Sequence, residues 1–483
     1  MAGNTASLST FACQIKNDGF RDIVVLGMGG SSLVSEVLRS AFPKRQGFPD
    51  LKVLDSTIPH SIRRMEELLD LRNSLFVIAS KSGNTAETLF LYQYFRDRIE
   101  TVVGAHKAGD HFVAITDQGS PLEHLATEEN FRHVFFSPED IGGRFSALSY
   151  FGLVPAALIG VDITVLIKRA QDMAASCKPD VPISSNPGVY LGCFLGSHAL
   201  HGRDKLTLST SLSITGFSLW VEQLIAESTG KLGRGIVPIT SEPQLALDDY
   251  GNDRVFIDLR TSNEDADSHF EQLDSLGHPC ERFILRDSYD LGGEFFRWEF
   301  ATAIASSLLR INPFSQPSVR RMKLATSKVL ESYKIIGELP EPSSSDPLET
   351  LAKHLANGSY IAIVSYLPQS QELDEAIDHL RTTITSRYRV ATTAGYGPRY
   401  LHSTGQLHKQ GPSDMLLIEL VETCSSDLQI PRNPYSFGVL TQARAIGDIQ
   451  LLCSLGRKAI RIDIGRNHQL GVARLTESLK KHP

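Results

Sequence analysis

The chain has 483 residues, a formal net charge of −7 at pH 7 and no long basic run, which argues against nucleic acid or an anionic membrane surface as its partner. Hydrophobic residues make up 41% and charged residues 21%, as in ordinary soluble globular proteins, and the length predicts two or three domains. No stretch reaches the roughly 18 apolar residues of a membrane span, and the first residues lack the charged start and apolar run of a secretion signal.

The cysteines are scattered along the chain, with no CxxC motif and no dense framework. This pattern predicts reduced, mostly buried thiols and therefore a cytoplasmic protein. The six residues are Cys13, Cys177, Cys193, Cys280, Cys424 and Cys453.

The first predicted element is a short apolar strand at residues 22–26, followed by a glycine loop at residues 27–32 (GMGGSS) and a helix at residues 33–42. Glycines let the backbone approach a ligand, and the amides of a helix N-terminus favour a phosphate. A dinucleotide is the alternative ligand, since Asp55 ends the next strand. However, Ser32 stands where the dinucleotide fingerprint has its third glycine.

A second loop of the same kind follows the strand predicted at residues 75–79. It reads Ser80-Lys81-Ser82-Gly83-Asn84-Thr85 and leads into another helix. Hydroxyls and backbone amides beside a fixed positive charge suit a phosphate monoester, although a solvated serine-rich loop would look similar. Two such loops after neighbouring parallel strands predict one ligand site, because ligands of open α/β sheets bind at the carboxyl ends of strands.

Further strands are predicted at residues 111–116 and 134–136, before a Gly-Gly-Arg turn that ends at Arg144 and leads into a helix. Arg144 is either a cation of the site or half of a structural ion pair. A helix from residue 163 and a connection rich in proline, serine and asparagine at residues 181–187 place a domain boundary there.

The helix predicted from residue 217 carries the strongest chemical candidate, Glu227. Apolar residues recur at helical spacing, and Glu227 continues the face of Trp220 and Leu224. Burial and the C-terminal end of the helix dipole both disfavour the anion, so we expect a raised pKa that suits a general base. A buried glutamate paired with an arginine is the alternative. Gly230 is expected to end the helix.

The second half again alternates strands and helices, which is compatible with two distant versions of one α/β unit. Residues 339–347 (LPEPSSSDP) are predicted to form a surface linker. The last helix, at residues 437–455, is followed by a strand at 459–464 that we expect to end the fold. The other predicted elements are strands at 205–208, 255–259, 282–285, 360–365, 388–392 and 415–421, and helices at 293–309 and 318–335.

A polar loop at residues 395–409 follows the strand at 388–392 and is a plausible edge of the site. It contains His402 and His408, which are six residues apart with no further His or Cys beside them, and this makes a poor metal site. From the loop alone, His402 is either structural or catalytic.

Several segments together resemble the phosphoglucose isomerase family, and most closely the isomerase part of transaldolase–phosphoglucose isomerase fusion proteins. They are WVEQLIAESTGK from Trp220, SKSGNTAET from Ser80, GGRFS around Arg144 and GPRYLHSTGQLHK around His402. The resemblance runs from about residue 22 to the last strand. It implies an α/β fold of two sugar-isomerase (SIS) domains, each a mostly parallel sheet flanked by helices. We assign residues 21–178 and 188–435 to these domains, 1–20 to an N-terminal extension, and 436–483 to a closing helix and strand.

The resemblance also implies the reaction, which interconverts glucose 6-phosphate and fructose 6-phosphate through a cis-enediol, with no metal or other cofactor. Glu227 would move the proton between C1 and C2, Arg144 would stabilise the negative charge, and His402 would assist ring opening. Members are usually homodimers in which this histidine reaches across to the partner's site. The substrate phosphate would be held by Ser31, Ser80, Lys81, Ser82 and Thr85.

The chain departs from the family in two places. About twenty residues stand where the fusion proteins carry a transaldolase, which indicates the isomerase part alone. Thr441 stands where a lysine is expected, and Arg444, one turn further on, has a side chain long enough to return a cation to that region. Two alternatives remain open: a non-catalytic sugar-phosphate-binding SIS protein, and an isomerase that also accepts mannose 6-phosphate.

Overall fold

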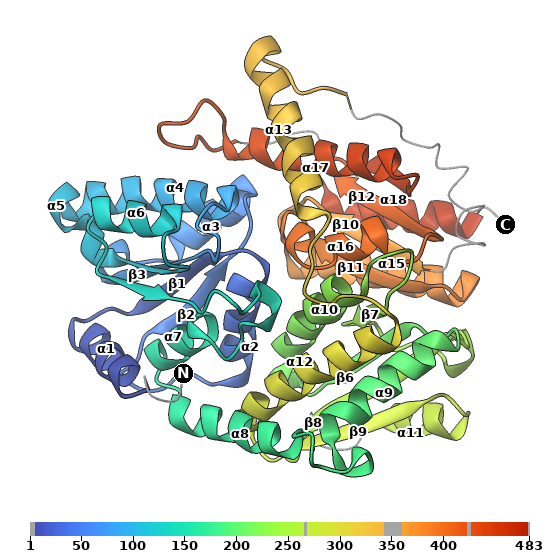
Figure 1. Ribbon diagram of the computed structural model, residues 1–483. Coiled ribbons are helices and arrows are strands. Elements are labelled where there is room, and N and C mark those ends of the chain that lie inside the picture. The colour runs from blue at the N-terminus through green and yellow to red at the C-terminus, as the bar shows by residue number, and fades with distance from the viewer. Residues whose placement is uncertain (1–4, 265–267, 342–359, 423–426, 482–483) are drawn as a thin grey trace.

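The computed structural model describes residues 5–264, 268–341, 360–422 and 427–481. Within these residues the chain forms three parallel β-sheets flanked by helices (Figure 1), which confirms the predicted α/β class. Among the described helices, none combines the length and the apolar composition that crossing a membrane requires.

The first sheet provides the edge on which the predicted phosphate loops lie. Along β1, Ile23 and Val25 face a core that includes α1 and α7, whereas Val24 and Leu26 face the core below α4, as alternation along a strand requires. The N-terminal extension is therefore an integral helix, α1 (Thr5–Asn17), packed on this sheet. The strand order is β2 (Asp50–Leu54), β1 (Asp22–Gly27), β3 (Ser74–Ala79), β4 (Phe112–Thr116) and β5 (His133–Phe136), all parallel.

Seven further helices belong to this part of the chain, and the last of them, α8, also packs against α12 (Leu291–Leu308) of the second half. They are α2 (Leu33–Ala41), α3 (Pro59–Glu67), α4 (Ala86–Val103), α5 (Ala105–Ala108), α6 (Pro121–Glu128), α7 (Tyr150–Leu158) and α8 (Ile163–Ser176).

The second half of the chain builds two more parallel sheets. In both, the first strand of the sheet lies between the second and the third, as it does in the first sheet. The range 188–435 therefore contains the second sheet and three strands of the third sheet. The last strand of the third sheet comes from residues 436–483. The division of the chain into domains stays a prediction. The orders are β7 (Val237–Thr240), β6 (Lys205–Thr210), β8 (Arg254–Thr261), β9 (Cys280–Leu285), and β11 (Ala391–Tyr396), β10 (Tyr360–Ser365), β12 (Met415–Val421), β13 (Lys458–Asp463).

The remaining described helices belong to the part of the chain that forms these two sheets. They are α9 (Pro187–Leu200), α10 (Gly216–Thr229), α11 (Ser268–Ser275), α12 (Leu291–Leu308), α13 (Val319–Ile336), α15 (Gln371–Tyr388), α16 (Gly405–Gln410), α17 (Phe437–Ser454) and α18 (His468–Lys481).

Two predicted boundaries in the second half are wrong. The strand predicted at 388–392 begins only at Ala391, because the buried face of α15 continues to Tyr388 and Arg389 ends that helix in the left-handed region, with φ of 54°. The strand after α17 does not end the fold, since α18 follows it and packs against α15. The linker predicted at 339–347 lies beyond the described residues from position 342 on.

The burial of the cysteines differs from the prediction. Cys177 is buried, but Cys193, Cys280 and Cys453 are only half-buried and Cys13 is exposed. The expectation that they are mostly buried is therefore wrong for the described cysteines. Cys424 lies outside the described residues.

Helix α10 occupies the centre of the molecule (Figure 1) and is buried on almost every side. It packs against α2 of the first unit, against β7 of the second sheet and against α16 beside the third. As predicted, the helix ends at Gly230, so Glu227 lies in its last turn. Because α10 touches all three units, its polar side chains can reach groups from each of them.

Glycines on α9 allow α12 to approach unusually closely. Gly188, Gly192 and Gly196 recur every four residues and therefore share one face of α9. A Cβ atom at Gly192 would lie 2.5 Å from the Cβ of Ile304 and 2.7 Å from the carbonyl oxygen of Ala301. The two backbones can pack at this distance only without a side chain at that position.

We expect Gly192→Ala to lower the free energy of unfolding by about 1–3 kcal/mol, the usual cost of forcing an extra carbon into a packed interface, reduced by the better helix propensity of alanine. Chemical denaturation measures this. Gly293→Ala is the matched control: it is a helical glycine whose added Cβ would have only ordinary contacts, the nearest at 3.4 Å. A Gly192 variant as stable as this control would contradict the close-packing argument.

Candidate active site

The predicted phosphate-binding residues gather at the carboxyl edge of the first sheet. β1 and β3 are neighbours, with Gly27 opposite Ala79, so the loops that follow them leave the sheet side by side. The Ser80 hydroxyl donates to that of Thr85 at 3.0 Å. Thr85 is the N-cap of α4 but its side chain caps no amide, so the first turn of α4 keeps amides available for an anion. Ser31 closes the 3-10 turn Gly29–Ser31.

Lys81, in contrast, is engaged in protein contacts. Its ammonium lies 2.8 Å from a carboxylate oxygen of Asp117 and 3.1 Å from the carbonyl oxygen of Pro138, to which it donates. Its charge is therefore already balanced. A phosphate at this edge would be held mainly by hydroxyls and backbone amides, and the predicted contact from Lys81 remains a prediction.

The glycine loop is shaped by other parts of the chain. Gly29 has a φ of +57°, and a Cβ atom there would lie 2.4 Å from the carbonyl oxygen of His402. A Cβ atom at Gly30 would lie 2.1 Å from the carbonyl oxygen of Gly143. The two glycines thus make room for the segments that carry His402 and Arg144, which explains a glycine pattern that departs from the dinucleotide fingerprint.

Glu227 and Arg144 meet in a buried pair. Arg144 lies on the 3-10 turn Gly143–Phe145, and its guanidinium is 3.5 Å from the Glu227 carboxylate. It also donates to the Ser228 hydroxyl at 2.8 Å and to the carbonyl oxygen of Pro313. Burial raises the pKa of Glu227, while Arg144 and the Gln223 amide oppose the rise. Both alternatives from the sequence therefore hold in part: Glu227 is paired with an arginine and still has a raised pKa.

Gln223 links this pair to the third unit, and sequence reasoning missed it. Its side-chain amide donates to Glu227 at 3.2 Å and to the carbonyl oxygen of His402 at 2.8 Å. His402 lies on the 3-10 turn Arg399–His402, after β11. Its imidazole Nε2 is 3.1 Å from the carboxylate of Glu87 in the same chain. The base, the arginine and the histidine are thus brought together within one chain.

Glu87 is the second functional side chain that the sequence did not reveal. It is fully buried in the first turn of α4 and is held by His402 and by the guanidinium of Arg444, at 2.8 Å. Burial by itself would raise the pKa of Glu87, but Arg444 and His402 outweigh it and hold that pKa well below its usual range. A signal was present in the sequence: Glu87 shares a four-residue spacing with the buried Leu91 and Phe95, so it begins a buried face of α4.

Thr441, at the position where a lysine was expected, is engaged by Thr57. Its hydroxyl lies 2.9 Å from the hydroxyl of Thr57 and donates to the Thr57 carbonyl oxygen at 3.0 Å. Arg444, one turn later on α17, instead brings a positive charge to Glu87. The sequence-based interpretation that Arg444 returns a cation to this region agrees with this geometry.

His408 has a structural position. Its two ring nitrogens lie 3.1 Å from the Tyr360 hydroxyl and 3.0 Å from the Thr404 hydroxyl. Burial lowers the pKa of His408 to about 3, so the ring is neutral. Among the residues that the structure describes, no group of three or more His, Cys, Asp or Glu side chains is arranged to hold a metal ion.

With this geometry in place, the chain can be compared with known proteins. Residues 13–235 match the family model "Phosphoglucose isomerase". The glucose-6-phosphate isomerase of Campylobacter jejuni is 28% identical over 355 residues, which cover 65% of this chain and 86% of that protein. The enzyme of Prochlorococcus marinus is 28% identical over 403 residues, 74% of this chain and 75% of that one. By these matches the chain is similar to phosphoglucose isomerases.

Solved structures resemble the chain in fold. A hypothetical protein from Thermus thermophilus has a TM-score of 0.61 and 25% identity, and covers 68% of this chain and 88% of its own. A glucose-6-phosphate isomerase from Chlamydia trachomatis has a TM-score of 0.58 and 20% identity, over 70% of this chain and 74% of its own. The match to the family model includes Ser31, Arg144 and Glu227 but ends before His402.

A second buried carboxylate on α10, Glu222, titrates near neutral pH. Its carboxylate accepts a hydrogen bond from the Thr240 hydroxyl at 3.0 Å. Burial raises the pKa of Glu222 from 4.5 to about 7, although the Thr240 bond, Arg381 and Arg399 favour the anion. A group with a raised pKa in the folded state stabilises the fold below its unfolded pKa, and this contribution is lost as the pH rises through about 7.

We therefore expect Glu222→Gln to become more stable relative to the unmodified chain as the pH rises from 4 to 8, by about 3 kcal/mol at most. Glutamine keeps the acceptor for Thr240 and never ionises. Urea unfolding at both pH values measures the difference. The exposed substitution Glu128→Gln is the control, and a Glu222 variant whose pH dependence parallels it would show that Glu222 is not the titrating group.

Proposed function

We propose that this protein is a glucose-6-phosphate isomerase, which interconverts glucose 6-phosphate and fructose 6-phosphate through a cis-enediol. The observation that carries the proposal is the buried Glu227–Arg144 pair beside the two loops at the edge of the first sheet. Aldose–ketose isomerisation needs a weak base, a group that stabilises an oxyanion, and an anchor for the distant phosphate. The site offers a group for each.

The phosphate would bind at the hydroxyls and amides of the loops after β1 and β3. Ser31, Ser80, Ser82 and Thr85 are the side chains that we assign to it, with Lys81 at the rim. Binding energy from this unreactive end of the sugar can hold C1 and C2 next to the base.

Glu227 would then take a proton from one of these carbons and return it to the other. Its raised pKa brings the carboxylate closer to the operating pH, where a general base is most effective. Gln223 fixes the carboxylate by a hydrogen bond at 3.2 Å. The position of the base is thus set before the substrate arrives.

Arg144 and His402 would act on the oxygens. Arg144 is held by Ser228 and by the carbonyl oxygen of Pro313, so its charge is already oriented when the enediolate forms. His402, supported by Glu87, would move the proton that ring opening requires. Arg444 keeps Glu87 ionised for that task.

The proposal also includes the subfamily, the oligomeric state, the cellular location and the range of substrates. The segments around Trp220 and His402 favour the isomerase part of transaldolase fusion proteins. A homodimer and a cytoplasmic location are expected from the family and the cysteine pattern, with neither nucleic acid nor a membrane as partner. Mannose 6-phosphate is the substrate to test beside fructose 6-phosphate.

We expect Glu227→Gln to lower kcat for fructose 6-phosphate at least ~100-fold, since a general base contributes about 10²- to 10⁴-fold, with little change in substrate binding. A coupled assay with both hexose phosphates measures it. Glu222→Gln, the same substitution on the same helix, is the control and should stay within a few-fold of the unmodified chain.

Two results would contradict this proposal. A Glu227 variant that keeps kcat within a few-fold excludes Glu227 as the base. Binding of fructose 6-phosphate without turnover by the unmodified chain would instead identify a sugar-phosphate-binding protein.

The position of His402 predicts that each site is built within one chain. Co-expressed Glu227→Gln and His402→Ala chains should therefore stay as inactive together as each is alone, because no site in a mixed dimer has both groups. If the histidine crosses to the partner's site, mixed dimers regain one intact site. Activity of the tag-purified mixed species measures this.

A second mixture controls for the effect of co-expression on assembly of the dimer. One chain carries both substitutions and is co-expressed with the unmodified chain. We expect about half of the activity per dimer, contributed by the unmodified chain. Loss of activity in this mixture, together with its recovery in the first, would contradict sites built within single chains.

A further inference from the structure

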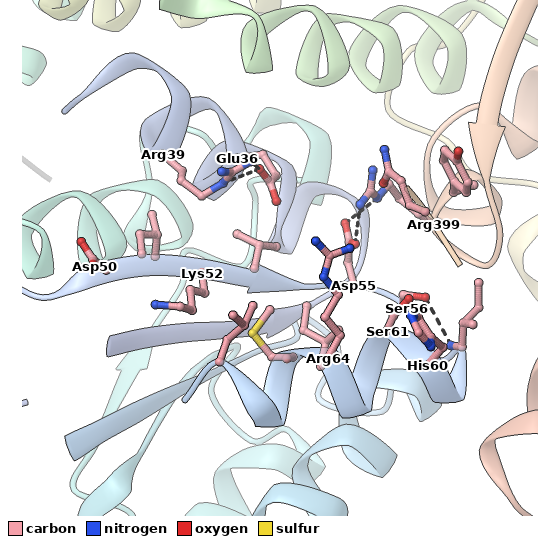
Figure 2. Close-up of a pocket in the computed structure, with 18 of the residues that line it drawn as sticks. Glu36, Arg39, Asp50, Lys52, Asp55, Ser56, His60, Ser61, Arg64 and Arg399 are labelled. Atoms are coloured by element: carbon pink, nitrogen blue, oxygen red, sulfur yellow. Dashed lines mark hydrogen bonds and ion pairs between the residues drawn. The ribbon is translucent and has the colours of Figure 1, made fainter. Parts of the chain in front are cut away.

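A cavity of about 640 Å³ lies between the first and third units, along the edge strand β2. Figure 2 shows β2 running through it, with Arg39 and Glu36 from α2 on one side, Arg64 from α3 on the other, and Arg399 at its far end. Residues after β10 and β11 complete the wall. Glu227, Arg144 and the SKSGNT loop do not line it.

The cavity carries more positive than negative charge, although the whole chain is negative. Most of its cations are paired: Arg39 with Glu36, Lys44 with Asp50, and Arg399 with Asp55. Lys52 is paired with Asp22, which lies outside the lining.

Arg64 is different. It is exposed, and within the part of the chain that the structure describes no hydrogen bond or ion pair holds its guanidinium. Figure 2 shows its side chain reaching from α3 into the cavity, toward the end of β2 that carries Asp55. A guanidinium offers five donors in a fixed fork that suits phosphate oxygens. The exposed Glu372 carboxyl on α15 is near enough to interact electrostatically with this charge. The cavity therefore presents an anion-binding group that no ion pair from the described residues occupies.

Polar groups beside Arg64 extend this surface. His60 and Ser61, from the first turn of α3, line the cavity together with Ser56. That turn contains no acidic residue and no side-chain cap, so its amides remain available to an anion. Met65 and Leu54 add apolar lining for the body of a molecule.

We propose that this cavity is a second binding site, for the phosphate group of a phosphorylated small molecule. The phosphate binds the guanidinium of Arg64 with the donors of His60 and Ser61, and the rest of the molecule lies along β2. The site goes beyond the proposed isomerase reaction and uses none of its residues. The Asp55–Arg399 pair forms the wall nearest to His402, since Arg399 and His402 share one 3-10 turn.

Calorimetric titration with inorganic pyrophosphate at low salt tests the proposal on the full chain. We expect the unmodified protein to bind it at this site, and Arg64→Gln to lower that affinity about ten-fold or more, the effect of losing a charge-assisted hydrogen bond. Arg64→Lys should retain part of the affinity, because it keeps the charge. Any binding at the loops after β1 and β3 is common to all variants and does not depend on Arg64.

Arg474→Gln on α18 is the matched control, an exposed helical arginine outside the cavity with the same change in charge. It should leave the isotherm unchanged. The proposal is overturned if Arg64→Gln binds pyrophosphate as the unmodified chain does, if Arg474→Gln weakens binding equally, or if the unmodified chain binds none. Thermal unfolding of each variant verifies that the fold is kept.

Discussion

The site depends on the neutralisation of one buried carboxylate. Glu87 is fully buried at the start of α4, and His402 and the guanidinium of Arg444 hold it from segments more than 300 residues later in the chain. Leaving such a charge without a partner costs about 3–5 kcal/mol. The first unit can therefore bury Glu87 only when the third unit is docked, and this docking brings His402 to the loops at the edge of the first sheet.

Helix α10, at the centre of the molecule, also carries buried polar groups that need partners. Because the helix is buried on nearly every side, its polar side chains need hydrogen-bond or ion-pair partners within the protein. Arg144 of the first unit pairs with Glu227, the carbonyl oxygen of His402 binds Gln223, and Thr240 of the second sheet binds Glu222. The polar contacts that prepare the base are therefore also contacts that join the three units.

The family match covers only part of the residues that the structure brings together at the site. The family match ends at residue 235, soon after the base, whereas His402 and Arg444 belong to the third unit. Two arginines link this unit to the others: the buried Arg381 donates to the carbonyl oxygens of Thr240 and Ser241, and the half-buried Arg399 is paired with Asp55. The third unit thus supplies the histidine and its support, and also one wall of the cavity along β2.

The sequence by itself determined the α/β class, most strands to within a few residues, the end of α10 at Gly230, and the position of Glu227 on a buried face. These features follow from local periodicity, glycine placement and loop chemistry, which act over one or two turns of chain. It could not reveal that His402 and Arg444 share Glu87, that Asp117 engages Lys81, or that no hydrogen bond or ion pair from the described residues holds the guanidinium of Arg64. Nor did it reveal that residues 188–435 divide between two sheets. Only the tertiary structure decided these points, because they depend on which distant segments meet, and a side chain's partners and burial do not exist before the units pack.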